Sequence, residues 1–166
     1  MLNLQFLINK GFTQEQLNTL TILDLANHAI ETIDEKLFET CSKLKELDLS
    51  DNKLKGIIDG TTFKLLTELT KLDISKNQLE SIDGKLFETF SNLTELRLHF
   101  NKLTRIDGNT FKPLVKLTKL WLFNNEIETL DEKAFEACSN LQELYLHENK
   151  LKKVHRKTFE NLNSIQ

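Results

Sequence analysis

The sequence predicts an α/β solenoid whose short strands pair in parallel on one face and whose helical or irregular turns form the opposite side. Three observations support this fold class. The phrase Leu-x-x-Leu-x-Leu-x-x-Asn-x-Leu recurs along the 166 residues, its copies are 24 or 25 residues apart, and a phenylalanine follows ten or eleven residues after each asparagine position. A repeat of this length forms one coil that cannot bury its apolar side alone, so successive coils must stack.

The strand of each coil is expected at the Leu-x-Leu segment, where apolar and polar residues alternate. This alternation directs the leucines into the core and the intervening residues toward solvent on the other face. Neighbouring strands lie about 4.8 Å apart, so equivalent positions form columns across the sheet. Six copies align on their second leucine, which is Leu23, Leu47, Leu72, Leu96, Leu120 or Leu144.

The asparagine of each copy is expected to end the strand by bonding its amide to buried backbone groups, which are costly to leave unpaired. It is Asn52, Asn77, Asn101, Asn125 or Asn149. The first copy has His28 at this position, and we interpret the histidine as an edge substitution rather than as a ligand.

The return half of each coil carries the phenylalanine, which favours a short helical turn over a second regular strand. The six rings are Phe38, Phe63, Phe87, Phe111, Phe135 and Phe159. In five copies an aspartate stands shortly before the ring, and these are Asp34, Asp59, Asp83, Asp107 and Asp131, whereas the last copy has His155. Aspartate is a strong N-cap, so each should start a helical turn. A calcium column is the alternative, but the loops lack the further oxygen ligands that calcium needs, and no metal or cofactor is expected.

These leucine, asparagine and phenylalanine positions resemble the leucine-rich repeat family, in its typical 24-residue class with a distal phenylalanine. The resemblance covers residues 20 to 166. It implies a right-handed horseshoe with the parallel sheet on the concave face, and a non-catalytic module that binds proteins there. The chain departs from the family in having Ile-Asp where Leu-Pro is common and in lacking cysteine-rich caps, which favours an intracellular over a secreted location.

The two ends of the chain are less regular than its middle. Residues 1–19 are expected to be an N-terminal capping segment, made of a shortened leading coil with a strand at residues 2–8 and a helical turn started by a capping box of Thr13 and Gln16. Residues 20–166 are expected to form six repeats, the last of them open-ended. The extra residue of the second full coil lies around Gly56, Ile57 and Ile58, and we interpret it as a tolerated insertion.

Composition excludes several functions. The formal charge of −3 and the pI near 5.8 argue against nucleic-acid binding, which needs a basic stripe, and no apolar run reaches membrane-spanning length.

Cys41 and Cys138 occupy the same repeat position four coils apart, roughly 19 Å, so they should be free thiols that serve as small core residues. No phosphate loop, nucleophile elbow or metalloprotease motif is present, so no enzyme activity is expected. Asn92-Leu93-Thr94 matches the glycosylation acceptor, a match short enough to arise by chance.

The residues between the leucines carry the functional signal. The central column reads Asp24, Asp48, Asp73, Arg97, Trp121 and Tyr145, and the next reads Ala26, Ser50, Ser75, His99, Phe123 and His147. The first three coils are small and acidic, whereas the last three gather the candidate partner-binding residues Arg97, His99, Phe100, Trp121, Phe123, Tyr145 and His147. Trp, Tyr and Arg dominate binding hot spots, although rings also favour strands for their β-propensity alone. Arg97 beside Trp121 is expected to make a cation–π contact. His99 and His147, about 10 Å apart, are too distant to share a zinc ion.

The sequence therefore predicts a protein partner on the concave face, centred on the C-terminal repeats. Two alternatives stay open. One is a structural role in which the open C-terminal end pairs with a second copy to form a homodimer. The other is the substrate-recognition arm of a larger receptor, effector or enzyme.

Overall fold

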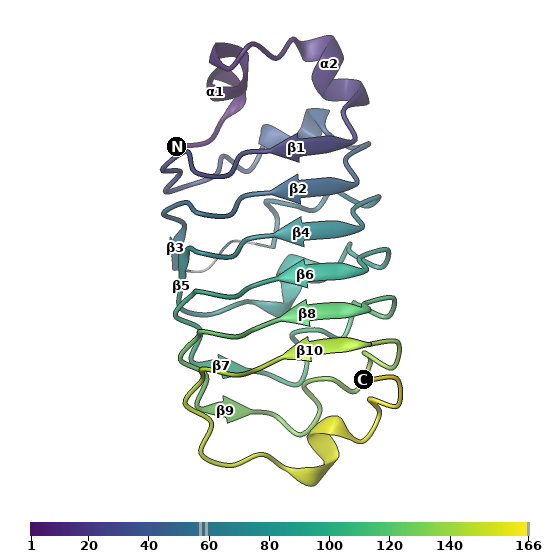
Figure 1. Cartoon of the computed structure of the whole chain (residues 1–166). Helices are drawn as coiled ribbons and strands as arrows, with labels where there is room; N and C mark the ends of the chain where they lie inside the picture. Colours follow the sequence, from purple (N-terminus) through teal and green to yellow (C-terminus); the bar gives the residue numbers. More distant parts are fainter. Residues whose placement is uncertain (57, 59, 166) are drawn as a thin grey trace.

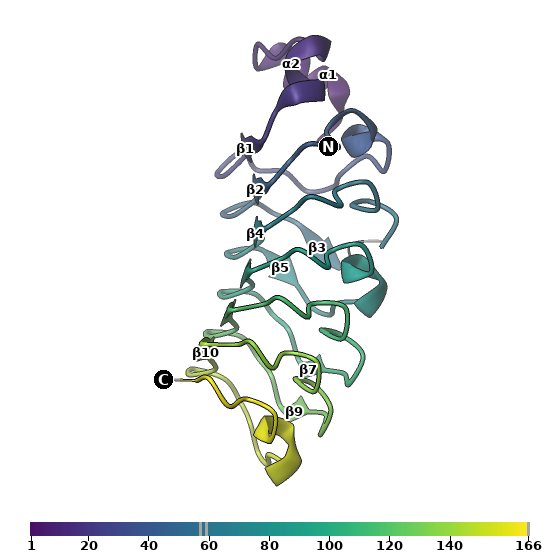
Figure 2. The same ribbon diagram turned by 90° about the vertical axis from the view of Figure 1, so that its right-hand side faces the viewer.

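The computed structural model describes residues 1–56, 58 and 60–165, and it is a parallel-strand solenoid as predicted (Figure 1). Its main sheet has six parallel strands in the order β1-β2-β4-β6-β8-β10. They are β1 (Ile22–Asp24), β2 (Glu46–Asp48), β4 (Lys71–Asp73), β6 (Glu95–Arg97), β8 (Lys119–Trp121) and β10 (Glu143–Tyr145). The side view shows these strands along one edge and the return turns along the other (Figure 2).

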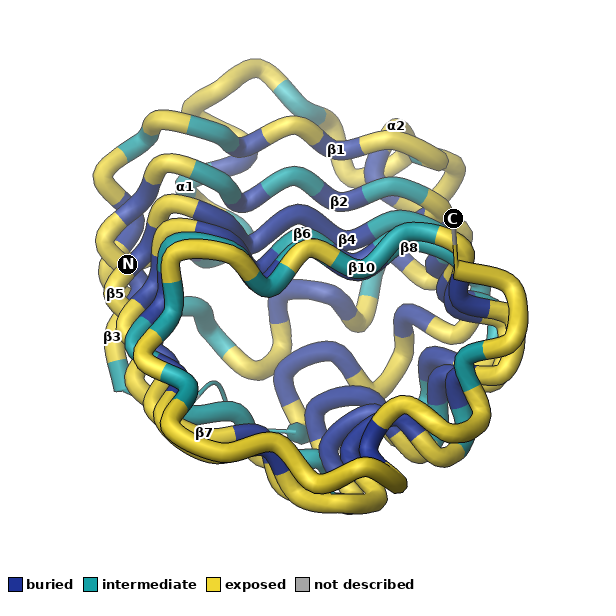
Figure 3. The backbone as a smooth tube through the Cα atoms, turned by 60° about the horizontal axis from the view of Figure 1, so that its bottom comes forward, coloured by how far each residue is buried: buried dark blue, intermediate teal, exposed yellow. Residues whose placement is uncertain are grey.

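The strand register aligns the repeat positions as the sequence predicts. Leu23 pairs with Leu47, and Leu72 with Leu96, so each leucine stacks on the equivalent leucine of the next coil. In Figure 3 the buried positions of successive coils lie one behind another, along the strands and along the inner turns. The core is therefore a continuous ribbon rather than a ball.

An asparagine ladder runs beside the strands. Asn101 is typical, because its Nδ2 donates to the carbonyls of Ile74 and Leu98, both at 3.0 Å, while its Oδ1 accepts from Leu79 N at 3.0 Å. At the first position His28 Nδ1 lies 2.7 Å from the Ala26 carbonyl. Asn52 of the next coil donates to the equivalent carbonyl, so His28 replaces part of the ladder's bonding, in agreement with its interpretation as an edge substitution.

The predicted phenylalanine column lines the far side of the core. Successive rings are 5.3 to 6.0 Å apart from centroid to centroid, except that Phe90 stands between Phe63 and Phe87. In the described residues the predicted helical turn is a 3₁₀ helix in three coils, η1 (Leu37–Thr40), η2 (Gly84–Phe87) and η3 (Arg156–Phe159), and the chain forms non-helical turns around Phe63, Phe111 and Phe135. Two small parallel sheets were not predicted, β3 (Lys55–Gly56) with β5 (Gln78–Leu79) and β7 (Arg105–Ile106) with β9 (Thr129–Leu130).

Of the predicted aspartate caps, Asp83 is the N-cap of η2, whereas the N-cap of η1 is Lys36 rather than Asp34. Asp34, Asp83 and Asp131 accept from the backbone N–H of the following lysines at 2.9 to 3.0 Å. Asp107 instead pairs with the Arg105 guanidinium, and Asp59 lies outside the described residues. His155 takes the same role in the last coil, since its Nδ1 accepts from Lys157 N at 3.3 Å. Over the part of the chain that the structure describes, no group of three potential metal ligands is found.

The predicted strand at residues 2–8 is wrong. Residues Leu4–Asn9 form the helix α1, because the Asn3 side chain accepts from Phe6 N at 2.9 Å and so starts a helix. Only Leu2 keeps an extended pairing, an isolated bridge to Ile33. The capping box of Thr13 and Gln16 is confirmed at the start of α2 (Gln14–Thr19). None of the helices in the described ranges is long and apolar enough to cross a bilayer.

The C-terminal end of the core is less covered than the N-terminal end. Leu2, Leu7 and Leu17 are fully buried near the N-terminus, whereas Val154 and Phe159 remain 41% and 39% exposed in the last coil.

Of the inserted segment around Gly56, Ile57 lies outside the described residues, and Gly56 has a positive φ of 73°.

Candidate binding surface on the concave sheet

The two predicted columns lie side by side on the concave face. The pairing of Asp73 with Arg97, of Arg97 with Trp121 and of Trp121 with Tyr145 places these side chains on adjacent strands. Each member of the second column lies two residues after the last residue of its strand, so the columns are adjacent. The sequence therefore located the candidate residues on one surface.

Six rings of this surface form one connected group, which we call the ring cluster. Phe123 is stacked between the two predicted histidines, 4.5 Å from His99 and 4.7 Å from His147 between centroids. Trp121 meets Tyr145 edge to face at 5.9 Å. The cluster consists of His99, Phe100, Trp121, Phe123, Tyr145 and His147.

Exposure differs within these columns, and here the sequence prediction needs a correction. All the intervening residues were expected to face solvent, but Asp73, Ser75 and His99 are only 5%, 2% and 8% exposed. They do lie opposite the leucine core, but Asp73 contacts Arg97 and Ser75, and His99 packs against Trp121 and Phe123. Phe100 and Tyr145, by contrast, expose 46% and 40% of their surface.

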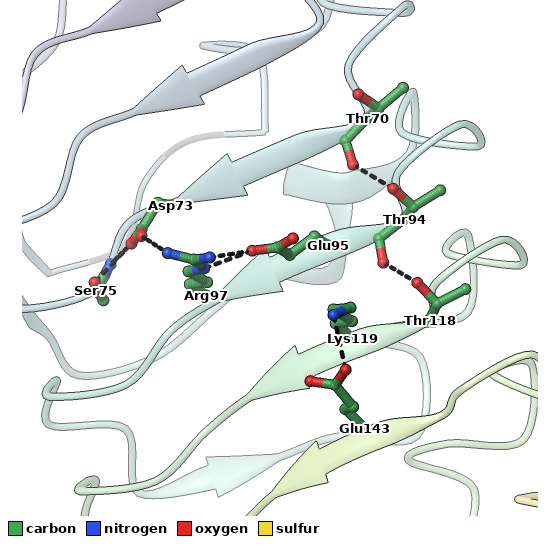
Figure 4. Close-up of polar contacts among 9 residues, drawn as sticks. All are labelled: Thr70, Asp73, Ser75, Thr94, Glu95, Arg97, Thr118, Lys119 and Glu143. Carbon is green, nitrogen blue, oxygen red and sulfur yellow. Dashed lines mark hydrogen bonds and ion pairs between the residues drawn. The ribbon is translucent and has the colours of Figure 1, made fainter. Parts of the chain in front are cut away.

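Arg97 joins the acidic and aromatic halves of the surface. Its guanidinium lies 4.3 Å from the Trp121 ring, which confirms the predicted cation–π contact. It also pairs with Glu95 at 2.5 Å and with Asp73 at 3.4 Å (Figure 4). Asp73 is held in turn by the Ser75 hydroxyl, which donates to it at 2.6 Å. Arg97 is thus fixed from three sides, and with it one face of Trp121.

Phe100 has an unfavourable backbone for its residue type, and the sequence reading missed this. Its φ is +54°, in the left-handed region that costs a side chain about 1 kcal/mol or more. The equivalent positions of the other coils are polar and also have positive φ: Asn27, Asp51, Lys76, Asn124 and Glu148. Comparing the copies at this position shows that only the fourth carries an aromatic residue. Neither core packing nor backbone preference accounts for an exposed phenylalanine here.

Two polar atoms of the ring cluster are buried without a partner. His99 Nδ1 and Trp121 Nε1 have no hydrogen bond within the described part of the chain, and an unmet buried donor or acceptor costs about 1 to 3 kcal/mol. Burial lowers the pKa of His99, which favours the neutral ring, although the Asp73 charge acts in the opposite direction. The cluster therefore carries unsatisfied polar groups beside its apolar surface.

The two thiols offer no reactive nucleophile. Cys41 and Cys138 are free and fully buried, as the sequence predicts. Burial raises the pKa of both, that of Cys138 to about 12, so neither is a thiolate near neutral pH.

The fold and this surface define a class of protein, a repeat solenoid with a parallel sheet on its concave face. Within that class the chain belongs to the leucine-rich repeat family, whose model matches residues 18–79, 67–127 and 116–166. Domains of this family commonly mediate protein–protein interactions and are typically non-catalytic. No curated protein matches the chain.

Similar solved structures agree with this family. The chain is 29% identical to a protein in the Toll–Spatzle complex of Drosophila, with a TM-score of 0.81 over 88% of this chain and 21% of that one. It is 28% identical to a leucine-rich repeat protein of Leptospira interrogans, with a TM-score of 0.79 over 92% of this chain and 37% of that one. The leucine-rich repeat domain of APL1, at 24% identity and a TM-score of 0.77, shares the fold over 84% of this chain and 36% of its own. The chain thus spans between a fifth and two fifths of these neighbours' lengths.

Proposed function

We propose that the protein is a non-catalytic recognition module that binds a protein partner on the concave face of β6, β8 and β10. The ring cluster is the observation that carries this proposal. Exposed Phe100 and Tyr145 stand at its surface, on a face opposite the core. Aromatic residues at well-packed sites supply most of the binding free energy in protein interfaces. An exposed apolar patch on a protein surface usually marks such an interface.

The strain at Phe100 supports the same proposal. A residue held in an unfavourable backbone conformation costs stability, and such residues gather at functional sites. The six rings also brace one another, so little side-chain freedom would be lost when a partner binds.

The test is affinity capture with the wild-type protein, followed by measurement of the captured partner's affinity for variants. Tyr145→Ala and Trp121→Ala should each weaken binding by about 2 kcal/mol, roughly 30-fold in Kd. Val115→Ala is the matched control, because Val115 is 47% exposed and apolar but lies outside the ring cluster. Normal affinity of both ring variants, with their unfolding unchanged, would place the site elsewhere.

The division of the chain is part of this proposal. We propose that residues 1–19 cap the N-terminal end of the core and that residues 20–166 form six repeats. Leu7 and Leu17 of the two helices are fully buried and belong to the same core as the repeats. Removing residues 1–19 should therefore lower the melting temperature, and an unchanged value would refute the capping role.

A second candidate is self-association through the C-terminal end. Val154 and Phe159 are exposed there, while Leu144, Leu151 and Leu162 are only partly buried. A second copy covering this surface would complete their burial. Light scattering over a range of concentrations decides the matter, since a strict monomer rules out stable pairing. The role of a recognition arm within a larger receptor, effector or enzyme is compatible with either candidate.

A further inference from the structure

The charges of the concave face are divided unevenly between its two ends. The column that begins each strand alternates in sign from β2 onward, in the order Glu46, Lys71, Glu95, Lys119 and Glu143. Opposite charges face each other on neighbouring strands, so this column largely neutralises itself. The central column does not, because Asp24, Asp48 and Asp73 are direct register partners. The end of the sheet away from the ring cluster is therefore negative.

Like charges directly opposite each other destabilise a sheet. Only Asp73 has this repulsion relieved, by Arg97. Asp24 and Asp48 make no ion pair within the described ranges, and each uses one oxygen to accept from the backbone, from Ala26 N at 2.9 Å and from Ser50 N at 2.8 Å. Those bonds hold the two carboxylates in fixed orientations. The carboxylates line a hollow on the face of β1, β2 and β4, whose other charged residues are Glu46, Lys71 and Asp73.

Arg97 shows inside the molecule how a cation is held on this surface. Its guanidinium bonds to the aspartate of the preceding strand and to the glutamate at the start of its own strand (Figure 4). The same pair of acids occurs earlier in the sheet, as Asp24 on β1 and Glu46 on β2, where Asp48 stands at the repeat position of Arg97. The chain places one cation at this hollow, Lys71, which is the register partner of Glu46 and, in the described part of the chain, makes no ion pair with Asp24 or Asp48. Guanidinium or ammonium groups form the strongest hydrogen bonds with such carboxylates.

His99 lies at the border between the acidic half of the sheet and the rest of the ring cluster, and one of its ring nitrogens has no hydrogen-bond partner in the described structure. His99 is 8% exposed, its Nδ1 has no partner in the described structure, and the charge of Asp73 acts on it. It packs at the same time against Trp121 and Phe123. A partner that crossed this border would meet the carboxylate column first and the aromatic rings next.

From this charge complementarity we infer that the partner presents an extended segment in which a lysine or arginine contacts Asp24 and Asp48 while an aromatic or large aliphatic side chain contacts the ring cluster. This inference rests on the proposed function and names its partner's chemistry. Asp48 and Trp121 are three strands apart, about 14 Å at 4.8 Å per strand. An extended chain advances about 3.3 Å per residue, so the cation and the apolar side chain are about four residues apart.

The probe is a displayed library of random dodecapeptides, selected on the wild-type protein, with the enriched peptides then synthesised for fluorescence-polarisation measurements. Enriched peptides should be basic, with a lysine or arginine about four residues from a ring. The variant Asp24→Asn/Asp48→Asn should bind them about tenfold or more weakly. Asparagine keeps the oxygen that accepts from the backbone, so the fold should persist, which thermal unfolding checks. Glu88→Gln, an exposed acid on η2's side of the coil, is the control and should bind within about twofold of wild type.

Acidic or neutral enriched peptides, an absence of enrichment, or unchanged affinity of the double variant would each overturn the inference. The Tyr145→Ala variant separates this result from failure of the proposed function. Peptides that need Tyr145 but not the two aspartates contradict the inference alone. Peptides that need neither contradict both.

Discussion

Replacing one asparagine of the ladder tests whether burial or the number of hydrogen bonds sets its contribution to stability. Asn101 is 7% exposed and makes three hydrogen bonds at 3.0 Å, to Ile74 O, Leu98 O and Leu79 N. In Asn101→Ala the Leu79 N–H loses its partner where water has little access, whereas Ile74 O still accepts from Asn77 and Leu98 O still accepts from Asn125. The unmet N–H costs about 1 to 3 kcal/mol and each of the two lost bonds to a carbonyl about 1 kcal/mol, so the substitution should lower the free energy of unfolding by about 3 to 5 kcal/mol.

Asn149 is the matched comparison at the open end of the ladder. It makes four hydrogen bonds, one more than Asn101. The residue is only partly buried, however, and water can replace its amide. Asn149→Ala should therefore cost about 1 to 2 kcal/mol, less than Asn101→Ala despite the larger number of bonds.

Urea unfolding followed by far-ultraviolet circular dichroism gives the two losses of free energy, provided that the transition stays two-state. Amide hydrogen exchange gives a local measurement, because Leu79 N and Ile127 N are the groups that donate to the two asparagines. Protection should fall more at Leu79 in the first variant than at Ile127 in the second. Equal losses, or a larger loss for Asn149→Ala, would refute the argument from burial.

Three further predictions concern single side chains. Phe100→Asn removes backbone strain of about 1 kcal/mol and ring contacts of similar worth, so the free energy of unfolding should change by less than about 1 kcal/mol while the affinity for the partner falls. Losses of stability and of affinity in proportion to each other would argue against a binding role. Burial lowers the pKa of His99 below its ordinary 6.5, so the unfolded chain binds more protons than the folded one, and stability should fall as the pH drops below about 6.5. Melting temperatures measured between about pH 5 and 8 should depend less on pH in His99→Gln than in the wild type. Cys138, with a pKa near 12, should react with a disulfide reagent at pH 8 far more slowly in the native than in the urea-unfolded protein, and equal rates would contradict its burial.

Most of the scaffold could be predicted from the repeat alone. The leucines, the asparagine ladder and the phenylalanine column recur at fixed spacing, and each copy needs its neighbours to bury its apolar side. The leading segment could not be predicted in this way. Leu2, Leu4 and Phe6 alternate like a strand, but the cap made by Asn3 and the burial of Leu7 against the first coil favour a helix.

The candidate site could likewise be predicted from the sequence only in part. Strand alternation placed Arg97, Trp121 and Tyr145 on one face, because a strand has only two faces and the leucines occupy the other. It could not show that His99 is covered, since coverage depends on rings contributed by coils 24 residues away.

The sequence by itself determined the solenoid, its register and the surface on which the rings stand, because a short period and strict alternation leave one way to bury the leucines. The tertiary structure alone decided which groups on that surface are exposed, strained or unpaired. The buried Nδ1 of His99 and the pairing of Arg97 with Asp73 and Glu95 arise from side chains of different coils meeting in space, whereas the positive φ of Phe100 recurs at the same position of the other coils. No local pattern encodes such contacts, since each depends on the residue that the next coil happens to carry.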